Sequence, residues 1–219
     1  MKIYDWKEIN GLEKGYYGER VLLRPLLECD VYPIFMATTN PAFNRYLLWD
    51  RPETITQLSE RIEKILDERR KGLMGVWVAA EITTGAFVAL FRAYTVEAPQ
   101  SLDKFHVGTG IWLHPNFWKG GLSVDVSKLS LDLIFNETPV DVLHAETHID
   151  NKASLGLFRA MGLEHSGTMD IDREDGTPSP SHLFQITRNA YRPSGFFRPS
   201  YQDIAATKGA LHNTALIQV

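Results

Sequence analysis

The spacing of apolar positions changes several times along this 219-residue chain, which predicts a mixture of strands and helices. Short apolar segments bounded by turn residues predict strands over residues 20–26, 76–82, 87–96, 104–113 and 142–149, and a further hairpin after Gly162. Apolar residues at helical spacing predict helices over residues 29–38, 54–71 and 153–161, and one more after Gly121. The Asn40-Pro41 pair breaks the first helix, and the aromatic loop NRYLLWDRP follows at residues 44–52.

This order of elements is typical of a single mixed α/β or α+β domain. We expect a mostly antiparallel central sheet of about six or seven strands, flanked by about four helices. The domain would cover residues 20–191, preceded by a lead-in over residues 1–19. The pattern stops at residue 192, so residues 192–219 form a C-terminal extension, packed on the domain or on a partner, or else poorly ordered. A homodimer could form through this extension.

Composition and charge narrow the range of functions. Apolar residues make up 44% of the chain and charged residues 23%, ordinary values for a soluble globular protein. The net charge of −4 gives no electrostatic reason to expect nucleic acid or an anionic membrane surface as a partner. No segment resembles a secretory signal or a membrane span. The single cysteine, Cys29, cannot form an internal disulfide, which is consistent with the reducing cytoplasm.

A glycine-containing turn precedes the predicted central helix, in the segment FWKGGLSVDVSKLSLDLIF at residues 117–135. The start of a helix presents backbone N–H groups and a partial positive charge, and glycines let a phosphate approach that backbone closely. The turn could therefore bind a pyrophosphate, or it could be a tight strand-to-helix connection without a ligand. It has neither the Walker spacing nor the Rossmann glycine pattern. The two glycines of GTGIWLHP, residues 108–115, predict a bulge that leaves strand backbone groups unpaired.

The strand at residues 142–149 carries three polar side chains, His144, Glu146 and His148, at every second position. They share one face, because side chains alternate along a strand. Either they form a solvated face of the sheet, or Glu146 or His148 acts as a general base, directly or through water. Their spacing matches no recognised zinc site, so we expect no metal. Asp172 and Glu174, in the last hairpin, are further acidic candidates or simply turn residues.

Several motifs in a fixed order resemble the GNAT acyltransferase superfamily, and in particular its RimJ/RimL-like branch, known for acetylating protein N-termini. The segment GIWLHPNFWKGGLSVDV, residues 110–126, is similar to the strand–turn–helix motif of that branch. The segment NKASLGLFRAMGLEHSG, residues 151–167, is similar to its second motif, and LLRPL, Asp30 and YLLWDRP are similar to its opening. The resemblance covers about residues 20 to 190 and implies a GNAT fold, with a splayed pair of strands that holds the cofactor.

The resemblance implies acetyl-coenzyme A as the cofactor and no metal. Backbone groups of Trp112 and Leu113 would hold the pantetheine arm, Asn151 would contact it, and Ser154 would lie near the sulfur. The pyrophosphate would be bound by the backbone amides of Lys119, Gly120, Gly121, Leu122, Ser123 and Val124. Many GNAT enzymes have a tyrosine seven residues after the asparagine, where this chain has Phe158.

We therefore expect an N-acetyltransferase that acts on a primary amine, either a peptide N-terminus or a small molecule. The alternatives are an acyl-CoA-binding sensor or scaffold with little catalysis, and a nucleotide-phosphate-binding protein that uses the same turn. Ser154, Glu146 and His148 are the catalytic candidates, with Ser154 donating a hydrogen bond to the departing thiolate. The aromatic residues Trp49 and Tyr46 are the candidates for the acceptor side, because the loop after the first helix borders the acceptor site in GNAT enzymes.

Overall fold

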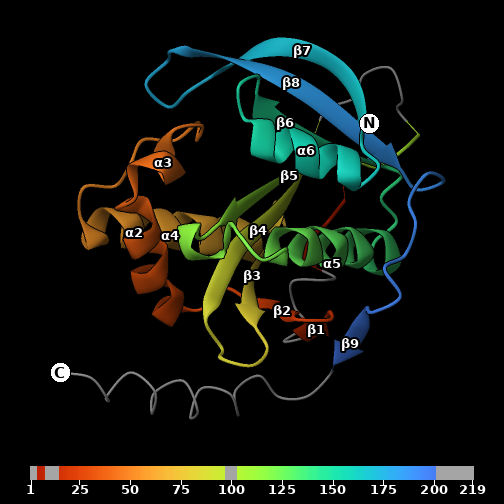
Figure 1. Ribbon diagram of the computed structural model, residues 1–219, viewed down its shortest axis with the longest axis horizontal. Helices are drawn as coiled ribbons and strands as arrows, with labels where there is room; N and C mark the ends of the chain where they lie inside the picture. The colour runs from red at the N-terminus through yellow and green to blue at the C-terminus, as the bar shows by residue number, and fades with distance from the viewer. Residues whose placement is uncertain (1–3, 8–14, 97–102, 201–219) are drawn as a thin grey trace.

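The computed structural model describes residues 4–7, 15–96 and 103–200. A sheet of nine strands runs through this part of the chain, in the order β7-β8-β6-β5-β4-β3-β2-β1-β9 (Figure 1). The strands are β1 (Gly15–Tyr17), β2 (Val21–Pro25), β3 (Met74–Glu81), β4 (Phe87–Thr95), β5 (His106–Leu113), β6 (Val142–His148), β7 (Glu164–Asp172), β8 (Pro178–Thr187) and β9 (Arg198–Ser200). Among the paired strands of this sheet, β5 and β6 run parallel and the other neighbours run antiparallel.

The predicted fold class, a mostly antiparallel sheet flanked by helices, is confirmed. Seven of the nine strands correspond to the strands expected from the sequence. The two additional strands, β1 and β9, are only three residues long, and they pair with each other at one edge. They lie in the segments that the sequence analysis assigned to the lead-in and the C-terminal extension. Three residues are too few for a periodic pattern to be visible in the sequence.

Helices cover both faces of the sheet (Figure 1). Val76 and Val78 of β3 pack with α2 (Val31–Thr38) and α4 (Ile55–Arg70), whereas Trp77 and Ala79 pack with α5 (Leu122–Glu137). Because side chains alternate along a strand, these two groups lie on opposite faces. We call them the α4 face and the α5 face. The shorter helix α6 (Lys152–Ala160) also packs on the α5 face, through half-buried apolar residues.

The helix boundaries follow from local capping. The Thr54 side chain accepts a hydrogen bond from the Gln57 amide at 3.2 Å, and the Gln57 side chain accepts one from the Thr54 amide at 3.3 Å. This reciprocal pair begins α4 where the sequence predicted it. The Asn40-Pro41 pair was expected only to break the preceding helix, but it also starts the short helix α3 (Pro41–Asn44). Asn40 caps α3, and a proline is well suited to the first helical position.

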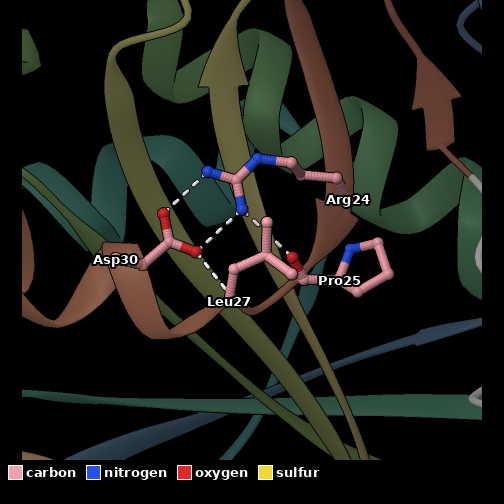
Figure 2. A network of polar contacts seen from close by, with 4 residues as sticks. All are labelled: Arg24, Pro25, Leu27 and Asp30. Atoms are coloured by element: carbon pink, nitrogen blue, oxygen red, sulfur yellow. Dashed lines mark hydrogen bonds and ion pairs between the residues drawn. The ribbon is translucent and has the colours of Figure 1, made fainter. Parts of the chain in front are cut away.

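A buried ion pair connects β2 to the turn that precedes α2 (Figure 2). The Arg24 guanidinium donates two hydrogen bonds to the Asp30 carboxylate, each 2.7 Å long, and both side chains are almost fully buried. Asp30 also accepts from the Leu27 amide at 2.9 Å, and Arg24 donates to the Pro25 carbonyl at 3.1 Å. Each partner thus satisfies the other's charge away from water, which ties the first helix to the sheet.

A second buried carboxylate binds the segment that leads to β9. Asp132 of α5 is inaccessible to solvent and accepts hydrogen bonds from the hydroxyl groups of Tyr191 and Ser194. It also accepts from the Ser194 amide at 3.1 Å. Residues 191–194 are therefore fixed across the C-terminal half of α5, so the chain passes from β8 at one side of the sheet to β9 at the other. No helix in the described part of the chain has the length and apolar character needed to cross a membrane.

Candidate active site

The parallel strands β5 and β6 separate partway along their length. Their pairing ends at Thr109 and Ala145, although β5 continues to Leu113 and β6 to His148. Beyond that point β5 still pairs with β4, and β6 still pairs with β8. The two strands therefore splay apart and leave backbone groups on their facing edges without a strand partner.

The bulge predicted from the glycines of β5 is absent, because β4 and β5 pair in continuous register through this region. The unpaired backbone groups of β5 therefore arise from its separation from β6, and not from a bulge. The His114 amide donates to the Val88 carbonyl on β4 at 2.8 Å. Since backbone groups alternate between the two edges of an antiparallel strand, Trp112 also directs its backbone toward β4, whereas Ile111 and Leu113 face the splay. The Leu113 carbonyl accepts a hydrogen bond from the Trp118 indole at 2.9 Å.

The turn before α5 adopts a conformation that favours glycine. Gly120 and Gly121 have φ angles of 91° and 80°, and Gly121 occupies the N-cap position. The amides of Val124 and Asp125 donate to the Gly121 carbonyl, whereas the amides ahead of them have no acceptor within the helix, as at the start of any α-helix. A Cβ atom added to Gly120 would meet no protein atom within 4 Å.

The residues predicted to bind the pyrophosphate differ in their exposure to solvent. Leu122 is buried and anchors the turn in the core, Ser123 and Val124 lie half-buried in the first helical turn, and Lys119 is exposed. Arg20, which the sequence analysis did not single out, fixes this turn. Its guanidinium forms an ion pair with Asp125 and donates to the Gly120 carbonyl at 2.9 Å.

The three polar residues of β6 share one face, as the alternation predicted, and that face is the α4 face. They have different partners. His144 contacts His106 through ring nitrogens 2.9 Å apart, and burial lowers the pKa of both imidazoles. Among the described residues, no group of three or more His, Cys, Asp or Glu side chains has an arrangement that could hold a metal ion.

Glu146 lies in the environment most suited to proton transfer. Burial raises the pKa of its carboxyl group above the ordinary glutamate value, and the positive charge of Arg92 only partly opposes this shift. The Tyr94 hydroxyl donates a hydrogen bond to Glu146 Oε1 at 3.4 Å. Burial, together with the Glu146 charge, raises the pKa of Tyr94 to about 12, so the phenol keeps its proton. A carboxylate with a raised pKa, located where the strands splay, can act as a general base.

The glycines of β5 allow two long side chains of β4 to lie across the sheet. A Cβ atom on Gly108 would be 2.6 Å from the Tyr94 ring, and one on Gly110 would be 3.3 Å from Arg92 Nε. Gly108 pairs with Tyr94, and Gly110 pairs with Arg92. Both side chains thus occupy the space above a glycine, and the Tyr94 hydroxyl reaches Glu146 on β6.

Tyr46, one of the two residues predicted to contact the acceptor, lies against His148 of β6. Tyr46 stacks on His148 with ring centroids 5.2 Å apart, and its hydroxyl donates to the Asp150 carbonyl at 3.2 Å. His148 Nδ1 accepts a hydrogen bond from the Asp150 amide at 3.1 Å, so a neutral imidazole carries its proton on Nε2. Glu146 accepts the Tyr94 hydrogen bond at Oε1, and within the described part of the chain its Oε2 accepts none.

Trp49 stacks on Trp112 with ring centroids 4.6 Å apart and an interplanar angle of 3°. The Arg61 guanidinium lies 4.6 Å from the Trp49 ring centroid on the α4 side. The last hairpin holds this loop, because Glu174 pairs with Arg61 at 3.0 Å and accepts from the Asp50 amide at 2.8 Å. Glu174 is thus engaged in positioning the loop, and these contacts lower its pKa, which disfavours it as a base.

Helix α6 begins one residue earlier than predicted. Asn151 caps it, accepting a hydrogen bond from the Ser154 amide at 3.2 Å. Ser154 is therefore not the cap, and its half-buried hydroxyl is not used for that purpose. Phe158 packs against Phe184 with ring centroids 5.2 Å apart.

Comparison with known proteins agrees with this geometry. Residues 20–164, more than half of the chain, match the family model described as the acetyltransferase (GNAT) domain. An uncharacterized N-acetyltransferase of Bacillus subtilis, YoaA, is 22% identical over 173 residues, which cover 78% of this chain and 94% of that protein.

The fold is also similar to those of solved acetyltransferases. RimJ of Mycobacterium smegmatis, in complex with CoA-disulfide, aligns with a TM-score of 0.71 and 15% identity, over 91% of this chain and 96% of that one. Spermidine N-acetyltransferase of Vibrio cholerae, in complex with CoA and spermine, aligns with a TM-score of 0.65 and 15% identity, over 78% of this chain and 98% of that one. The match to the family model over most of the domain shows that the chain belongs to the GNAT acetyltransferase family.

Proposed function

We propose that this protein is an N-acetyltransferase that transfers an acetyl group from acetyl-CoA to a primary amine at the β5–β6 splay. The observation that carries the proposal is the position of Glu146, a carboxylate whose pKa is raised by burial, at the point where the two strands separate. The matched family supplies the reaction type. A peptide N-terminus or a small-molecule amine would serve as the acceptor.

The residues present fit coenzyme A. The exposed Gly120-Gly121 backbone at the start of α5 can accept a pyrophosphate, because a side chain at Gly120 would extend into open space instead of toward protein atoms. The peptide-like pantetheine arm can bond to the free strand edge in the manner of an added strand. The backbone groups of Ile111 and the Leu113 amide face that edge, so we assign this contact to them, whereas the Leu113 carbonyl already accepts from Trp118 and the Trp112 ring stacks on Trp49. The Asn151 side-chain nitrogen can contact the same arm.

Acetyl-CoA supplies the activated thioester when it is bound. The acceptor must reach it as a neutral amine, and its proton must be removed during attack. Glu146 is the candidate to accept that proton at a carboxylate oxygen, directly or through water, and Tyr94 fixes the carboxylate by a hydrogen bond. Ser154, near the start of α6, can donate a hydrogen bond to the departing sulfur, and the partial positive charge of the helix favours the developing anion. His148 would orient the acceptor together with Tyr46.

The alternative of a binding module with little catalysis rests on Phe158, which has no proton to give at the position where many GNAT enzymes carry a tyrosine. Two measurements on the same protein separate the proposals. Isothermal titration with acetyl-CoA, CoA and ATP should give binding of the first two and none of ATP. Thiol release from acetyl-CoA should then depend on a primary amine from a panel of peptides, polyamines and amino acids. Binding of acetyl-CoA without thiol release for any amine would favour the binding module, and binding of ATP would favour the nucleotide alternative.

A further inference from the structure

Arg92 is a partly buried cation beside the splay that forms no ion pair with any carboxylate in the described part of the chain. Its Nε atom is inaccessible to solvent and has no hydrogen-bond partner among the residues that the structure describes. Other arginines near the sheet are satisfied differently. Arg24 is bonded twice to Asp30, and Arg188 donates to three backbone carbonyls. The half-buried guanidinium interacts with the Glu146 carboxylate through charge alone, without an ion pair. A buried N–H without an acceptor is energetically unfavourable, so the unused donors of Arg92 require another explanation.

Two aromatic rings hold Arg92 in place without using its donors. Its guanidinium carbon lies 5.6 Å from the ring centroid of Tyr94 and 5.6 Å from that of Trp112. Contacts of this kind use the faces of the rings and leave the N–H groups of the guanidinium available for an anion. Arg92 is therefore oriented, but its guanidinium donates no hydrogen bond to any described residue.

The position of Arg92 links it to the proposed reaction. Arg92 on β4 pairs with Gly110 on β5, and its side chain lies over that glycine. On the other side of β5, Gly108 pairs with His144 of β6. If the same register is continued by two residues, Glu146 lies opposite Gly110. Because Gly110 has no side chain, no side chain of β5 stands between the cation of β4 and the carboxylate of β6. Backbones two strands apart are about 10 Å apart even without a splay. The space between Arg92 and Glu146 can accommodate a small molecule that carries both an amine and a carboxylate.

The anion is not expected to be a phosphate of the cofactor. Arg92 lies on the α4 face, with Leu90 of the same strand in the α4 cluster, whereas α5 and the turn before it pack on the α5 face. The acceptor candidates Trp49 and Tyr46 lie on the Arg92 side, since Trp49 stacks on Trp112 and Tyr46 stacks on His148. An anion at Arg92 would thus belong to the acceptor.

We propose that Arg92 binds a carboxylate of the acceptor, so that the preferred substrate carries a carboxylate close to its reactive amine. This inference rests on the proposed function. A free amino acid and a peptide with an acidic residue next to its N-terminus share this chemistry. A planar carboxylate suits the two parallel donors of a guanidinium.

The test compares matched acceptors with and without the carboxylate. One pair is glycine and glycinamide, and the other is the peptide amides Ala-Glu-Ala and Ala-Gln-Ala. Acetylation is measured as kcat/KM for the wild type, for Arg92→Met, which keeps an unbranched apolar side chain, and for Arg70→Met as the control. Arg70 has a 66% exposed side chain at the end of α4. The pair that shows a preference identifies the source of the carboxylate.

We expect the wild type and Arg70→Met to prefer the carboxylate-bearing member of one pair by at least about tenfold, the effect of one good charge-assisted contact. Arg92→Met should lose that preference, mainly through an increased KM for the carboxylate-bearing acceptor. Equal use of both members of each pair by the wild type, or an unchanged preference in Arg92→Met, would overturn the inference while leaving the acetyltransferase intact.

A binding measurement separates this inference from the proposed function. Titration with glycine, followed by tryptophan fluorescence, should give a saturable change in the wild type and Arg70→Met, because Trp112 contacts Arg92. Glycinamide should give a smaller change, and Arg92→Met should give none with either compound. If no acceptor is acetylated but this pattern appears, the proposed function fails and the carboxylate site stands. If the wild type shows no saturable change with glycine or with the acidic peptide, the site is rejected.

Discussion

Individual side chains at this site combine structural and chemical roles, and Ser154 illustrates how the two can be separated. A serine near the start of a helix is commonly its cap, and loss of a cap costs typically about 1 kcal/mol. Here Asn151 performs that role, so the Ser154 hydroxyl is available for another.

We predict that Ser154→Ala lowers kcat by about tenfold, roughly 1.4 kcal/mol of barrier, through loss of a hydrogen bond to the departing sulfur. The melting temperature and the affinity for acetyl-CoA should change little. Asn151→Ala is the matched stability control and should lower the melting temperature, because it removes the cap. An unchanged kcat in Ser154→Ala would remove the serine from the mechanism.

The Arg24–Asp30 pair supports stability and not chemistry. Both side chains are buried, at 5% and 2% exposure, so removal of one leaves the other charged without a partner. We predict that Asp30→Ala lowers the free energy of unfolding by about 3–5 kcal/mol. For a chain of this size, thermal melting should then fall by roughly 10 °C or more.

Asp67→Ala provides the comparison for Asp30→Ala. Asp67 forms ion pairs with Arg70 and Lys71 on the exposed side of α4, where solvent screens the charges. Its loss should change the melting temperature little. Equal effects of the two substitutions would contradict the view that burial makes the Arg24–Asp30 pair important.

At the scale of elements, the last hairpin positions the loop that carries Trp49. Glu174 binds Arg61 and the Asp50 amide, and the Glu174 amide donates to the Leu48 carbonyl at 2.8 Å. Arg173 donates to the Leu47 carbonyl at 3.1 Å. The loop between α3 and α4 is thereby held against the end of β7 by contacts that are mostly exposed.

We predict that Glu174→Ala raises KM for the acceptor by about threefold to tenfold, since loss of an exposed contact of this kind is worth about 1 kcal/mol. The affinity for acetyl-CoA and the melting temperature should be nearly unchanged. Glu164→Ala, at the exposed start of β7, is the control. If Glu174→Ala instead weakened acetyl-CoA binding and left the acceptor KM unchanged, the loop would not belong to the acceptor side.

Much of the fold could be predicted from local patterns, but the site could be predicted only in part. Alternation on β6 correctly placed His144, Glu146 and His148 on one face. The glycines of β5 were interpreted as a bulge, because a sequence does not show that Tyr94 and Arg92 from the neighbouring strand occupy the space above them. The sequence also does not single out Arg92, because only the folded structure shows that no described carboxylate forms an ion pair with it. The stacking of Trp49 on Trp112 depends likewise on tertiary packing.

At the scale of the whole molecule, Asp132 connects the helix at the centre of the domain to the strand at its edge. Its carboxylate accepts from Tyr191 and Ser194 and is the point where the chain turns toward β9. The phenol of Tyr191 is held protonated, because burial and the Asp132 carboxylate raise its pKa well above the ordinary value.

We predict that Asp132→Ala lowers the free energy of unfolding by about 3 kcal/mol, because it leaves two half-buried hydroxyl groups and the Ser194 amide without their acceptor. Amide hydrogen exchange at the β1–β9 edge should accelerate more than exchange at the β4–β5 pair in the centre of the sheet. Asp103→Ala, at an exposed position, is the control. Uniform acceleration across the sheet would show that Asp132 stabilises the whole domain and has no special role at this edge.

Glu146 connects the chemistry of the site to the stability of the whole domain. A carboxyl whose pKa is raised on folding binds its proton more tightly in the folded state, so it favours folding at low pH. This contribution is lost as the pH rises through the raised pKa, where the buried carboxylate becomes charged. Glu146→Gln should therefore melt at a higher temperature than the wild type at neutral pH, with the difference shrinking as the pH falls below the raised pKa.

The most direct test of the proposed mechanism is the pH dependence of kcat/KM for wild type and Glu146→Gln with the best acceptor. Ionisation of the amine acceptor affects both proteins alike, so it cancels in the ratio of the wild-type kcat/KM to that of the variant. We expect the variant to be at least about a hundredfold slower at neutral pH, within the usual range for loss of a general base. The ratio of wild type to variant should fall toward low pH with an apparent pKa above the ordinary glutamate value of about 4.3. A variant that retains the wild-type rate, or a ratio independent of pH, would contradict the assignment of Glu146 as the base.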